Sequence, residues 1–182
     1  MKRTNHKQRN MILTNDPSLT AWGYAVIDSD GVVRDAGCIK TSSESKARRI
    51  RKGDDRVRRI SEINHILLLK IRDWGVGYIL SELPHGSQTA SAAVMIGITA
   101  GIVQTLADSF KLGIEWYSEG DAKKHLLNKR SATKQEVINA ISEHYDIPWT
   151  GVKYKDEAIA DAMAIYHVAQ DQSSMLRFLK TP

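Results

Sequence analysis

The sequence predicts a single α/β domain in which helices flank a mixed sheet of five strands. Three short apolar segments separated by turn residues open the chain, a long amphipathic helix follows them, and strands and helices then alternate. This order is typical of helices layered on a sheet. The chain has 182 residues, of which 42% are hydrophobic and 26% charged, and this is the size and composition of one globular domain.

The first three strands are predicted to be antiparallel neighbours. Met11 to Leu13 is a short apolar run that leads into the turn residues Asn15 to Ser18, and Tyr24 to Ile27 resumes the apolar pattern. A second turn separates that strand from Val32 to Ile39, which is the third. The connections between these strands are too short for parallel crossovers, so antiparallel pairing is expected.

A helical period begins near Arg56. Apolar residues then recur at three- and four-residue spacing as far as Trp74, so one face of this helix is expected to pack on a core. Gly75 and Gly77 end the pattern, and Tyr78 to Glu82 follows as a short buried strand. A strand, a long helix and another strand in this order indicate a parallel crossover.

The second half of the chain adds one strand and several helices. Ser87 to Phe110 is rich in alanine and apolar on several sides, which predicts a largely buried helix whose Gly97 and Gly101 permit close backbone approach. Ile114 to Tyr117 is the fifth strand. Three further helices are expected at Asp121 to Leu127, Lys134 to Tyr145 and Asp156 to Gln170. We assign residues 1–10 to a flexible basic arm, 11–172 to the folded domain and 173–182 to a C-terminal tail.

The charge of the chain favours a polyanionic partner. The formal net charge is +5, and Lys46 to Arg59 holds eight basic residues against only Asp54 and Asp55. A solvated helix face explains such a run equally well, so the run alone does not identify a nucleic-acid-binding surface.

Cysteine usage and hydropathy indicate the compartment. Cys38 is the single cysteine, so an internal disulfide is excluded and a reducing environment is expected. Its flanks have the pattern of a strand, which favours buried packing over a nucleophilic role. We expect a cytoplasmic protein, in a bacterium or a phage-infected host cell, that is neither secreted nor membrane-bound, because no apolar signal segment is evident.

Acidic residues stand where predicted strands end. Asp16 ends the first strand and Glu82 the fourth, and a parallel crossover can place two such strand ends side by side. Glu157 and Asp161 are four residues apart and share a face of the last long helix. Each acid has a simpler explanation when taken alone: Asp16 suits a turn, and acids near a helix N-terminus are favourable.

Several acids that converge in a basic chain point to a metal-dependent reaction on phosphate. Hard divalent cations prefer oxygen ligands, and two ions roughly 3.5–4 Å apart can stabilise both the attacking and the leaving oxygen of a phosphodiester. The sequence carries no Walker loop, no Gly-x-Ser-x-Gly, no His-Glu-x-x-His and no Gly-x-Gly-x-x-Gly pattern that would indicate another chemistry.

The segment from Ile12 to Ile27 resembles the first-strand motif of the RuvC-type Holliday junction resolvases. It contains the run Asp16-Pro17-Ser18-Leu19-Thr20, which is typical of phage-like members of that family. The resemblance covers about Ile12 to Gln170, and it continues in order through Gly37 to Thr41, Ser81-Glu82, Ser131 to Val137 and Ala160 to Ile165. It implies an RNase H-like fold, a homodimer, and an enzyme that cuts four-way or otherwise branched DNA with two Mg²⁺ ions per active site, for which Mn²⁺ substitutes.

The resemblance also implies a set of catalytic residues. Asp16, Glu82 and Asp161 match three of the four metal-binding acids of the family. The fourth acid lies three residues before Asp161 in many relatives, and here that position is Ala158. Helical spacing makes Glu157 the best substitute, with Asp156 as the runner-up.

Basic side chains complete the implied site. Lys124 and Lys134 fall where the family carries basic residues near the scissile phosphate, although surface solubility would also explain them. His85 is the planar side chain that follows Glu82, at a place where some relatives insert an aromatic residue into the junction. Further DNA contacts are expected from Arg48, Arg49, Arg51, Lys52, Lys123, Lys129 and Arg130.

Two rival functions stay open at the level of sequence. An ATPase or sugar kinase of the actin-like group also has an aspartate after its first strand, but such chains are commonly longer and use several glycines in the phosphate loop. A junction-binding protein without catalytic activity is the other rival, and Ala158 is the one feature that suggests it.

Overall fold

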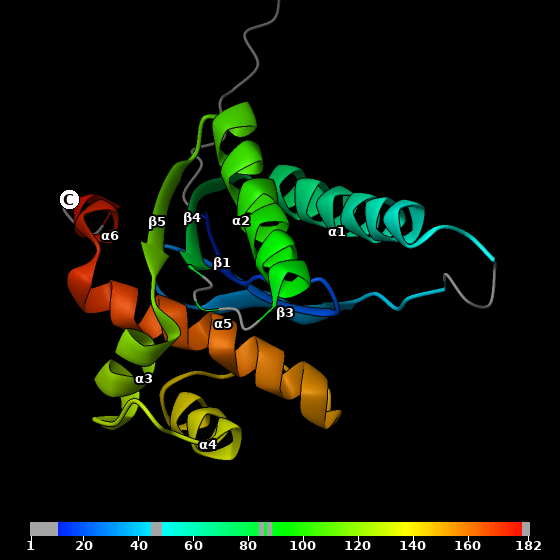
Figure 1. Ribbon diagram of the computed structural model, residues 1–182. Helices are drawn as coiled ribbons and strands as arrows, with labels where there is room; N and C mark the ends of the chain where they lie inside the picture. The colour runs from blue at the N-terminus through cyan, green and yellow to red at the C-terminus, as the bar shows by residue number, and fades with distance from the viewer. Residues whose placement is uncertain (1–10, 45–48, 84–85, 87–88, 180–182) are drawn as a thin grey trace, which may run out of the picture.

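The computed structural model describes residues 11–44, 49–83, 86 and 89–179, and these residues build a five-stranded sheet (Figure 1). The strand order is β3-β2-β1-β4-β5. β1 pairs antiparallel with β2 and parallel with β4, β2 pairs antiparallel with β3, and β4 pairs parallel with β5. The predicted mixed sheet is confirmed. Its strands are β1 (Met11–Asp16), β2 (Ala21–Ile27), β3 (Val33–Lys40), β4 (Val76–Glu82) and β5 (Gly113–Tyr117).

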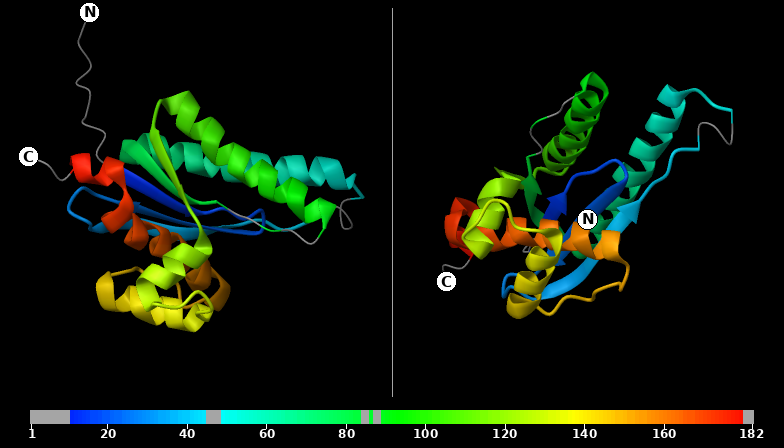
Figure 2. Two further views of the ribbon diagram at one scale, coloured as in Figure 1. Left: turned by 60° about the vertical axis from the view of Figure 1, so that its left-hand side comes forward. Right: turned by 60° about the horizontal axis from the view of Figure 1, so that its bottom comes forward.

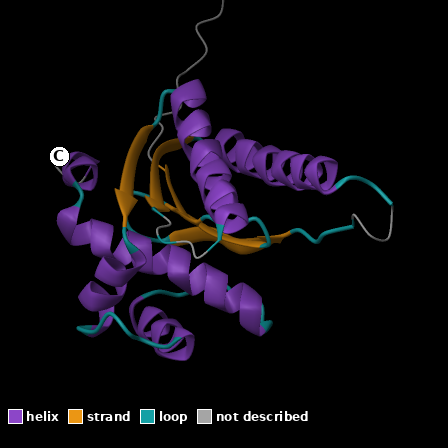
Figure 3. Ribbon diagram, viewed as in Figure 1, coloured by secondary structure: helices purple, strands orange, loops and turns teal. Residues whose placement is uncertain are grey.

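Helices cover both faces of the sheet (Figures 1 and 3). Two long helices, α1 and α2, lie on one face, and the further views show α3, α4 and α5 on the other (Figure 2). A short helix, α6, follows α5 at the end of the described chain. The helices are α1 (Lys52–Trp74), α2 (Ala90–Phe110), α3 (Glu119–Leu127), α4 (Lys134–His144), α5 (Lys153–Gln172) and α6 (Ser174–Leu179).

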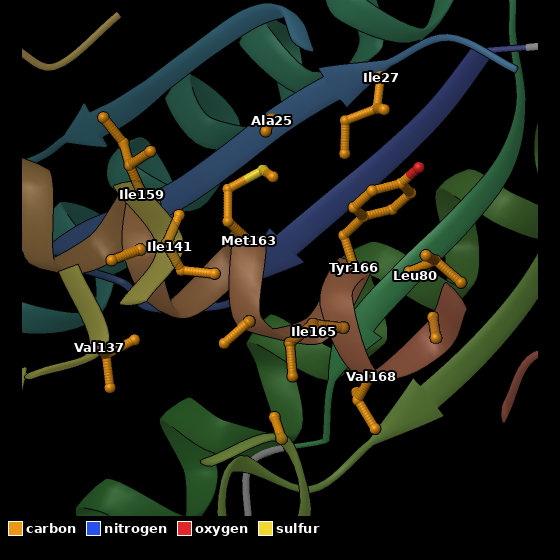
Figure 4. Close-up of a cluster of buried hydrophobic side chains, with 14 of the residues drawn as sticks. Ala25, Ile27, Leu80, Val137, Ile141, Ile159, Met163, Ile165, Tyr166 and Val168 are labelled. Atoms are coloured by element: carbon orange, nitrogen blue, oxygen red, sulfur yellow. The ribbon is translucent and has the colours of Figure 1, made fainter. Parts of the chain in front are cut away.

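The sheet separates two hydrophobic cores. One core joins the sheet to α1 and α2 through side chains such as Leu13, Ile63, Leu67 and Val103. The other is organised around α5, and Figure 4 shows Met163 and other side chains of this helix packed between the sheet and α4. Nearly every residue from 158 to 169 on α5 is buried. This helix is therefore the central support of the second layer.

One glycine permits α5 to lie directly on the sheet. A Cβ atom at Gly23 would stand 1.9 Å from the backbone oxygen of Ala158, which is far inside van der Waals contact. Thr14 fixes the same contact from β1, because its hydroxyl donates a 2.6 Å hydrogen bond to the carbonyl of Ala162. Helix and sheet are thereby held in register beside the end of β1.

The helix boundaries differ from the prediction at both ends of the domain. α1 begins at Lys52 rather than near Arg56. The first turn was not predicted because it is polar and carries no apolar periodicity. Beyond Gln172, where a tail was expected, the chain forms α6. Leu176 of α6 is buried, and the backbone amide of Met175 donates to Glu115 on β5. Residues 173–177 are thus packed on the domain.

The prediction that the second long helix is largely buried is wrong for its first half. In α2 the buried residues are Thr99, Ile102, Val103, Leu106 and Ala107, all in the second half. Val94 is 53% exposed, and a Cβ at Gly97 or Gly101 would meet nothing within 4 Å. In the first half of this apolar helix, the face that carries Val94 and Gly97 is not covered by the described part of the chain.

α2 is also long and apolar enough to cross a membrane, by length and composition alone. A single helix of this kind is weak evidence, because the core helix of a globular domain meets the same criterion. The second half of α2 packs in the core between this helix and the sheet, as the core helix of a globular domain does.

Candidate active site

Two acids lie side by side where parallel strands end. Asp16 is the last residue of β1 and Glu82 the last residue of β4. These strands are direct neighbours, and Asn15 pairs with Ser81 in their parallel register, so the residues that follow each of them stand at the same edge of the sheet. The predicted juxtaposition of these two strand ends is confirmed.

The third acid comes from α5. Asp161 is only 6% exposed and lies between Ala158, whose carbonyl touches β2, and Ala162, whose carbonyl accepts from β1. The helix therefore presents Asp161 to the end of the sheet that carries Asp16. This burial, together with the apolar surroundings of α5, raises the energy of the carboxylate form unless a cation stands nearby.

The pKa of Asp16 reflects several negative charges close to it. Burial raises the pKa of Asp16 well above its usual value, and the charges of Glu82, Asp161 and Glu119 raise it further, while Lys134 acts in the opposite direction. Burial likewise raises the pKa of Asp161, against the lowering effect of Lys134. The acids therefore act on one another as one cluster.

Lys134 is the cation inside this cluster. Its Nζ donates a hydrogen bond to Asp161 and lies 3.6 Å from a carboxylate oxygen of Glu119. Burial alone lowers the pKa of Lys134, but its interactions with the charges of Asp161, Glu119 and Asp16 raise it overall. The ammonium group of Lys134 is therefore held in its charged form among the acids.

Glu119 was not predicted from the sequence. It starts α3, two residues after β5 ends, and β5 is the parallel neighbour of β4. The end of β5 therefore lies at the same edge as Glu82. The strand-end argument that places Asp16 beside Glu82 applies equally to the acid that follows the fifth strand, so the signal for Glu119 is present in the sequence.

α3 presents Lys123, rather than Lys124, to the acids. Lys123 Nζ donates to Glu119 at 2.5 Å, and its charge lowers the pKa of Asp161. Lys124 instead lines a separate pocket, of about 450 Å³, with Asp121, His125, Asn128 and Gln172. One residue along a helix is a rotation of about 100°, so the two lysines point in different directions.

Neither candidate for the fourth acid, Glu157 or Asp156, is among the charges that act on Asp16 and Asp161. The charges that shift the pKa of Asp16 and of Asp161 do not include Glu157, whose side chain is partly exposed on the first turns of α5. Asp156 accepts hydrogen bonds from the backbone amide and the hydroxyl of Thr150, at 2.8 and 2.7 Å. Asp156 therefore holds the loop that precedes α5, which leaves Glu157 as the freer of the two acids.

The carboxylates supply the oxygen donors that a hard divalent cation prefers. Among the described residues, no three His, Cys, Asp or Glu side chains already stand in the arrangement of a metal site. The surroundings of Asp16 nevertheless suit a cation, because burial and the charges of Glu82 and Asp161 disfavour its carboxylate form, which a bound divalent ion would stabilise. The carboxylates of the site therefore fit a divalent cation. The ammonium group of Lys134, paired with Asp161, already places one positive charge among them.

The predicted DNA contacts lie on two surfaces. Arg49, Arg51 and Lys52 are exposed at the start of α1, where Arg51 is paired with Asp54. On the other layer, Lys129 is paired with Glu136 and Arg130 with Asp121. Arg48 and His85 fall outside the described residues.

Comparisons with known proteins agree in sequence and in fold. No family model matches the chain. It is 24% identical over 163 residues to the crossover junction endodeoxyribonuclease RuvC of Shewanella sp. (strain W3-18-1), and 25% identical to that of Shewanella amazonensis, with 88% of each chain covered.

Solved structures show the same fold. Thermus thermophilus RuvC in complex with a Holliday junction substrate superimposes with a TM-score of 0.70 at 18% identity, and covers 91% of this chain and 96% of its own. The yeast mitochondrial Holliday junction resolvase Ydc2 matches with a TM-score of 0.63 at 11% identity, over 93% of this chain and 81% of its own. The chain is therefore similar in sequence to the RuvC-type resolvases along most of its length, and it shares their RNase H-like fold.

Proposed function

We propose that this chain is a divalent-metal-dependent endonuclease that resolves Holliday junctions or related branched DNA by phosphodiester hydrolysis. The observation that carries the proposal is that Asp16 lies at the end of the sheet within reach of the charges of Glu82 and Asp161, with Lys134 paired to Asp161. The curated relatives, which are named crossover junction endodeoxyribonuclease, match the chain across most of its length. The solved relative in complex with a Holliday junction supports the choice of substrate.

Asp16, Glu82 and Asp161 are the residues that would hold the metal, with Glu157 as the fourth acid. The expected cofactor is Mg²⁺, with two ions per active site and Mn²⁺ as a substitute. When bound, such ions supply Lewis-acid stabilisation of the charge that develops on phosphate oxygens. The fixed strand ends of β1 and β4 place their acids without a large rearrangement, because both are held in a central pair of the sheet.

Lys134 is suited to act on the phosphate. Its ammonium group is paired with Asp161, and a cation bound by that carboxylate would weaken this pairing. Its ammonium group could then donate to a non-bridging oxygen of the scissile phosphate, where charge develops. Lys123 would keep Glu119 neutralised and is a better candidate than Lys124 for the second basic residue.

A homodimer would supply the two active sites that symmetric resolution of a junction needs. The exposed half of α2 offers a surface for it: Ala90, Val94, Gly97 and Gly101 share one helix face, and the two glycines leave room for a second helix. Such a protein would act in the cytoplasm, where DNA is accessible.

The direct test is the nicking of an end-labelled four-way junction. The wild-type chain should cut it in Mg²⁺ on the order of 5 mM, and EDTA should abolish the cuts. A matched linear duplex should be left intact. A chain that binds the junction but never nicks it would be a non-catalytic binding protein, whereas a large thermal stabilisation by ATP without nicking would favour the actin-like ATPase group.

A further inference from the structure

A pocket next to the catalytic strand end is lined by two arginines. It has a volume of about 420 Å³ and lies between the loop that joins β1 to β2, the first half of α1 and the first half of α2. Pro17, which directly follows Asp16, forms part of its wall. A molecule in this pocket would therefore lie next to the residue that follows Asp16, the acid at the end of β1.

The arginines of the pocket differ from the other described arginines of α1. Those elsewhere on the helix are paired with carboxylates: Arg58 with Asp55 and Glu62, and Arg72 with Asp73. Within the described part of the chain, Arg56 and Arg59 form no ion pair, and their guanidiniums donate to neutral oxygens. The positive charge of α1 is thus left without a carboxylate where the helix faces the pocket.

Arg59 is held rigidly in this position. It is only 9% exposed, and its guanidinium donates to the hydroxyl of Thr41 at 2.8 Å and to the carbonyl of Leu19 and the hydroxyl of Thr20 at 3.0 Å each. A buried charge satisfied only by neutral groups is costly, and an anion in the adjoining pocket would reduce that cost.

Arg56 faces the same pocket from one turn earlier on α1. Its guanidinium donates to Ser91 on α2 at 2.9 Å, so the two helices are bridged above the pocket by a neutral hydrogen bond that a ligand could replace. Arg56 is half-buried rather than fully enclosed. It can therefore reach an incoming anion by a change of side-chain conformation alone.

The rest of the pocket combines the hydroxyls of Ser18, Thr20 and Thr99 with an apolar wall. Leu19 lines it from the loop, and Ala92, Met95 and Ile96 line it from the face of α2 opposite to Val94 and Gly97. A free inorganic anion would make no use of these side chains. A nucleotide presents both an anionic phosphate and an apolar sugar and base face, so it matches guanidinium groups beside an apolar wall.

We propose that this pocket, the Arg56–Arg59 pocket, binds a nucleotide that flanks the scissile phosphate in the cleaved strand, with its phosphate on the two guanidiniums and its base against Met95 and Ile96. This proposal rests on the proposed nuclease function. It assigns strand positioning to a site separate from the exposed basic residues at the start of α1, and it explains why two arginines of this helix lack acidic partners.

The test combines a protein variant with a neutralised phosphate. Junctions would carry one methylphosphonate at each position around the cut in turn, and affinity would be measured in EDTA for the wild-type chain and for Arg56→Gln. At one flanking position we expect the neutral phosphate to weaken wild-type binding about tenfold, as for removal of a charge-assisted hydrogen bond. The same methylphosphonate should weaken binding of the Arg56→Gln variant clearly less than binding of the wild type, because this variant has already lost one of the two guanidiniums that contact that phosphate.

The control is Arg72→Gln, which removes an exposed arginine from the far end of the same helix. Its affinity should fall by the same factor as that of the wild type at that phosphate. Arg59→Gln, checked for folding by thermal unfolding, should repeat the result for Arg56→Gln. If the variant and the methylphosphonate weaken binding additively at every position, or if Arg56→Gln binds as tightly as the wild type, the pocket does not bind a nucleotide of the junction. An acidic protein partner or no ligand would then be its occupant. Non-additivity without Mg²⁺-dependent nicking would instead support the pocket and contradict the nuclease.

Discussion

At the scale of single residues, the site is built from charges that the fold forces together. Asp16 is half-buried at the end of β1, and burial together with the charges of Glu82 and Asp161 raises its pKa. The carboxylate of Asp16 therefore destabilises the metal-free folded state at neutral pH, and this deficit develops as the pH rises above the ordinary aspartate pKa. The cluster therefore lowers the free energy of unfolding, as is common where binding or catalysis needs like charges close together.

Replacement of Asp16 by asparagine should stabilise the metal-free protein. We expect Asp16→Asn to melt at a higher temperature than the wild type in EDTA, because it removes the buried charge without changing the side-chain shape. Addition of Mg²⁺ should raise the melting temperature of the wild type more than that of Asp16→Asn. Differential scanning fluorimetry measures both effects, with Asp146→Asn, at an exposed position, as the control. A lower melting temperature for Asp16→Asn in EDTA would contradict this account of the cluster.

The fourth acid can be assigned by comparing three variants. Glu157→Gln should reduce Mg²⁺-dependent cleavage far more than Asp156→Asn, since Glu157 is one helical turn from Asp161, whereas Asp156 is engaged by Thr150. Asp156→Asn should instead lower thermal stability slightly. Cleavage rates at saturating and limiting Mg²⁺ would separate metal binding from later steps.

Glu119→Gln is the third of these variants and tests the acid that the sequence did not suggest. If Glu119 only neutralises Lys123 and Lys134, cleavage should fall by less than with Glu157→Gln. A larger loss of cleavage in Glu119→Gln than in Glu157→Gln would place Glu119 among the metal ligands and remove Glu157 from that role.

At the scale of helices and strands, most of the fold could be predicted because its elements have strong local signals. The strands carry short apolar runs between turns, and α1 has a clear apolar stripe, so their type and order followed from the sequence. The burial of α2 did not follow, because apolar composition does not tell which surface covers a helix. The choice between Lys123 and Lys124 depended on the rotation of α3, which a nine-residue helix with a weak stripe leaves undetermined.

A cluster of histidines links three of these helices away from the acids. His125 on α3, His144 on α4 and His167 on α5 lie in contact, with the ring of His167 tilted against the other two at centroid distances of 5.5 and 4.8 Å. Burial lowers the pKa of His167, and the charges of His144 and His125 lower it further against the opposing effect of Asp171. Nδ1 of the neutral ring can accept from the Tyr145 hydroxyl, 2.9 Å away, and a protonated ring cannot.

The packing of these helices should therefore weaken in acid. The pKa of His167 is lower in the folded chain than in the unfolded chain, so its contribution to stability is full above the ordinary histidine pKa of about 6.5 and is lost as the pH falls below that value. Melting temperatures between pH 8 and pH 5.5, roughly spanning that titration, should fall more steeply for the wild type than for His167→Gln. His65→Gln, on the exposed side of α1, should keep the wild-type slope. Equal slopes in all three proteins would exclude the cluster as the cause.

At the scale of the whole molecule, the two layers divide the proposed work. The sheet and α5 fix the acids, while α1 and α2 carry the basic and apolar surfaces that face outward beside them. The sequence placed Asp16 and Glu82 at neighbouring strand ends, as the parallel pairing of β1 with β4 confirms, but it missed Glu119 after β5. The second part depends on which helix faces stay uncovered, and no local sequence signal reports that.

Assembly and DNA binding should respond to different substitutions. Val94→Glu on the exposed face of α2 should convert a dimer to a monomer in sedimentation equilibrium, because it buries a charge in the expected interface. Replacement of Arg48, Arg49 and Arg51 by glutamine should leave the dimer intact and reduce the dependence of junction affinity on salt by roughly 0.9 in the logarithmic slope for each phosphate that is no longer neutralised. A Val94→Glu variant that stays dimeric would move the dimer interface elsewhere, and a monomeric wild type would contradict the dimer. An unchanged slope would move the DNA surface elsewhere.

The measurement that tests the central claim most directly is the paired assay of cleavage and binding for Asp16→Asn, Glu82→Gln and Asp161→Asn on a labelled four-way junction. Each variant should lose detectable Mg²⁺-dependent cleavage, because it removes an oxygen donor from the cation, and should bind the junction with nearly wild-type affinity, because affinity comes mainly from cationic contacts to phosphates. Wild-type cleavage by any one of the three would contradict the assignment of these acids to the catalytic site.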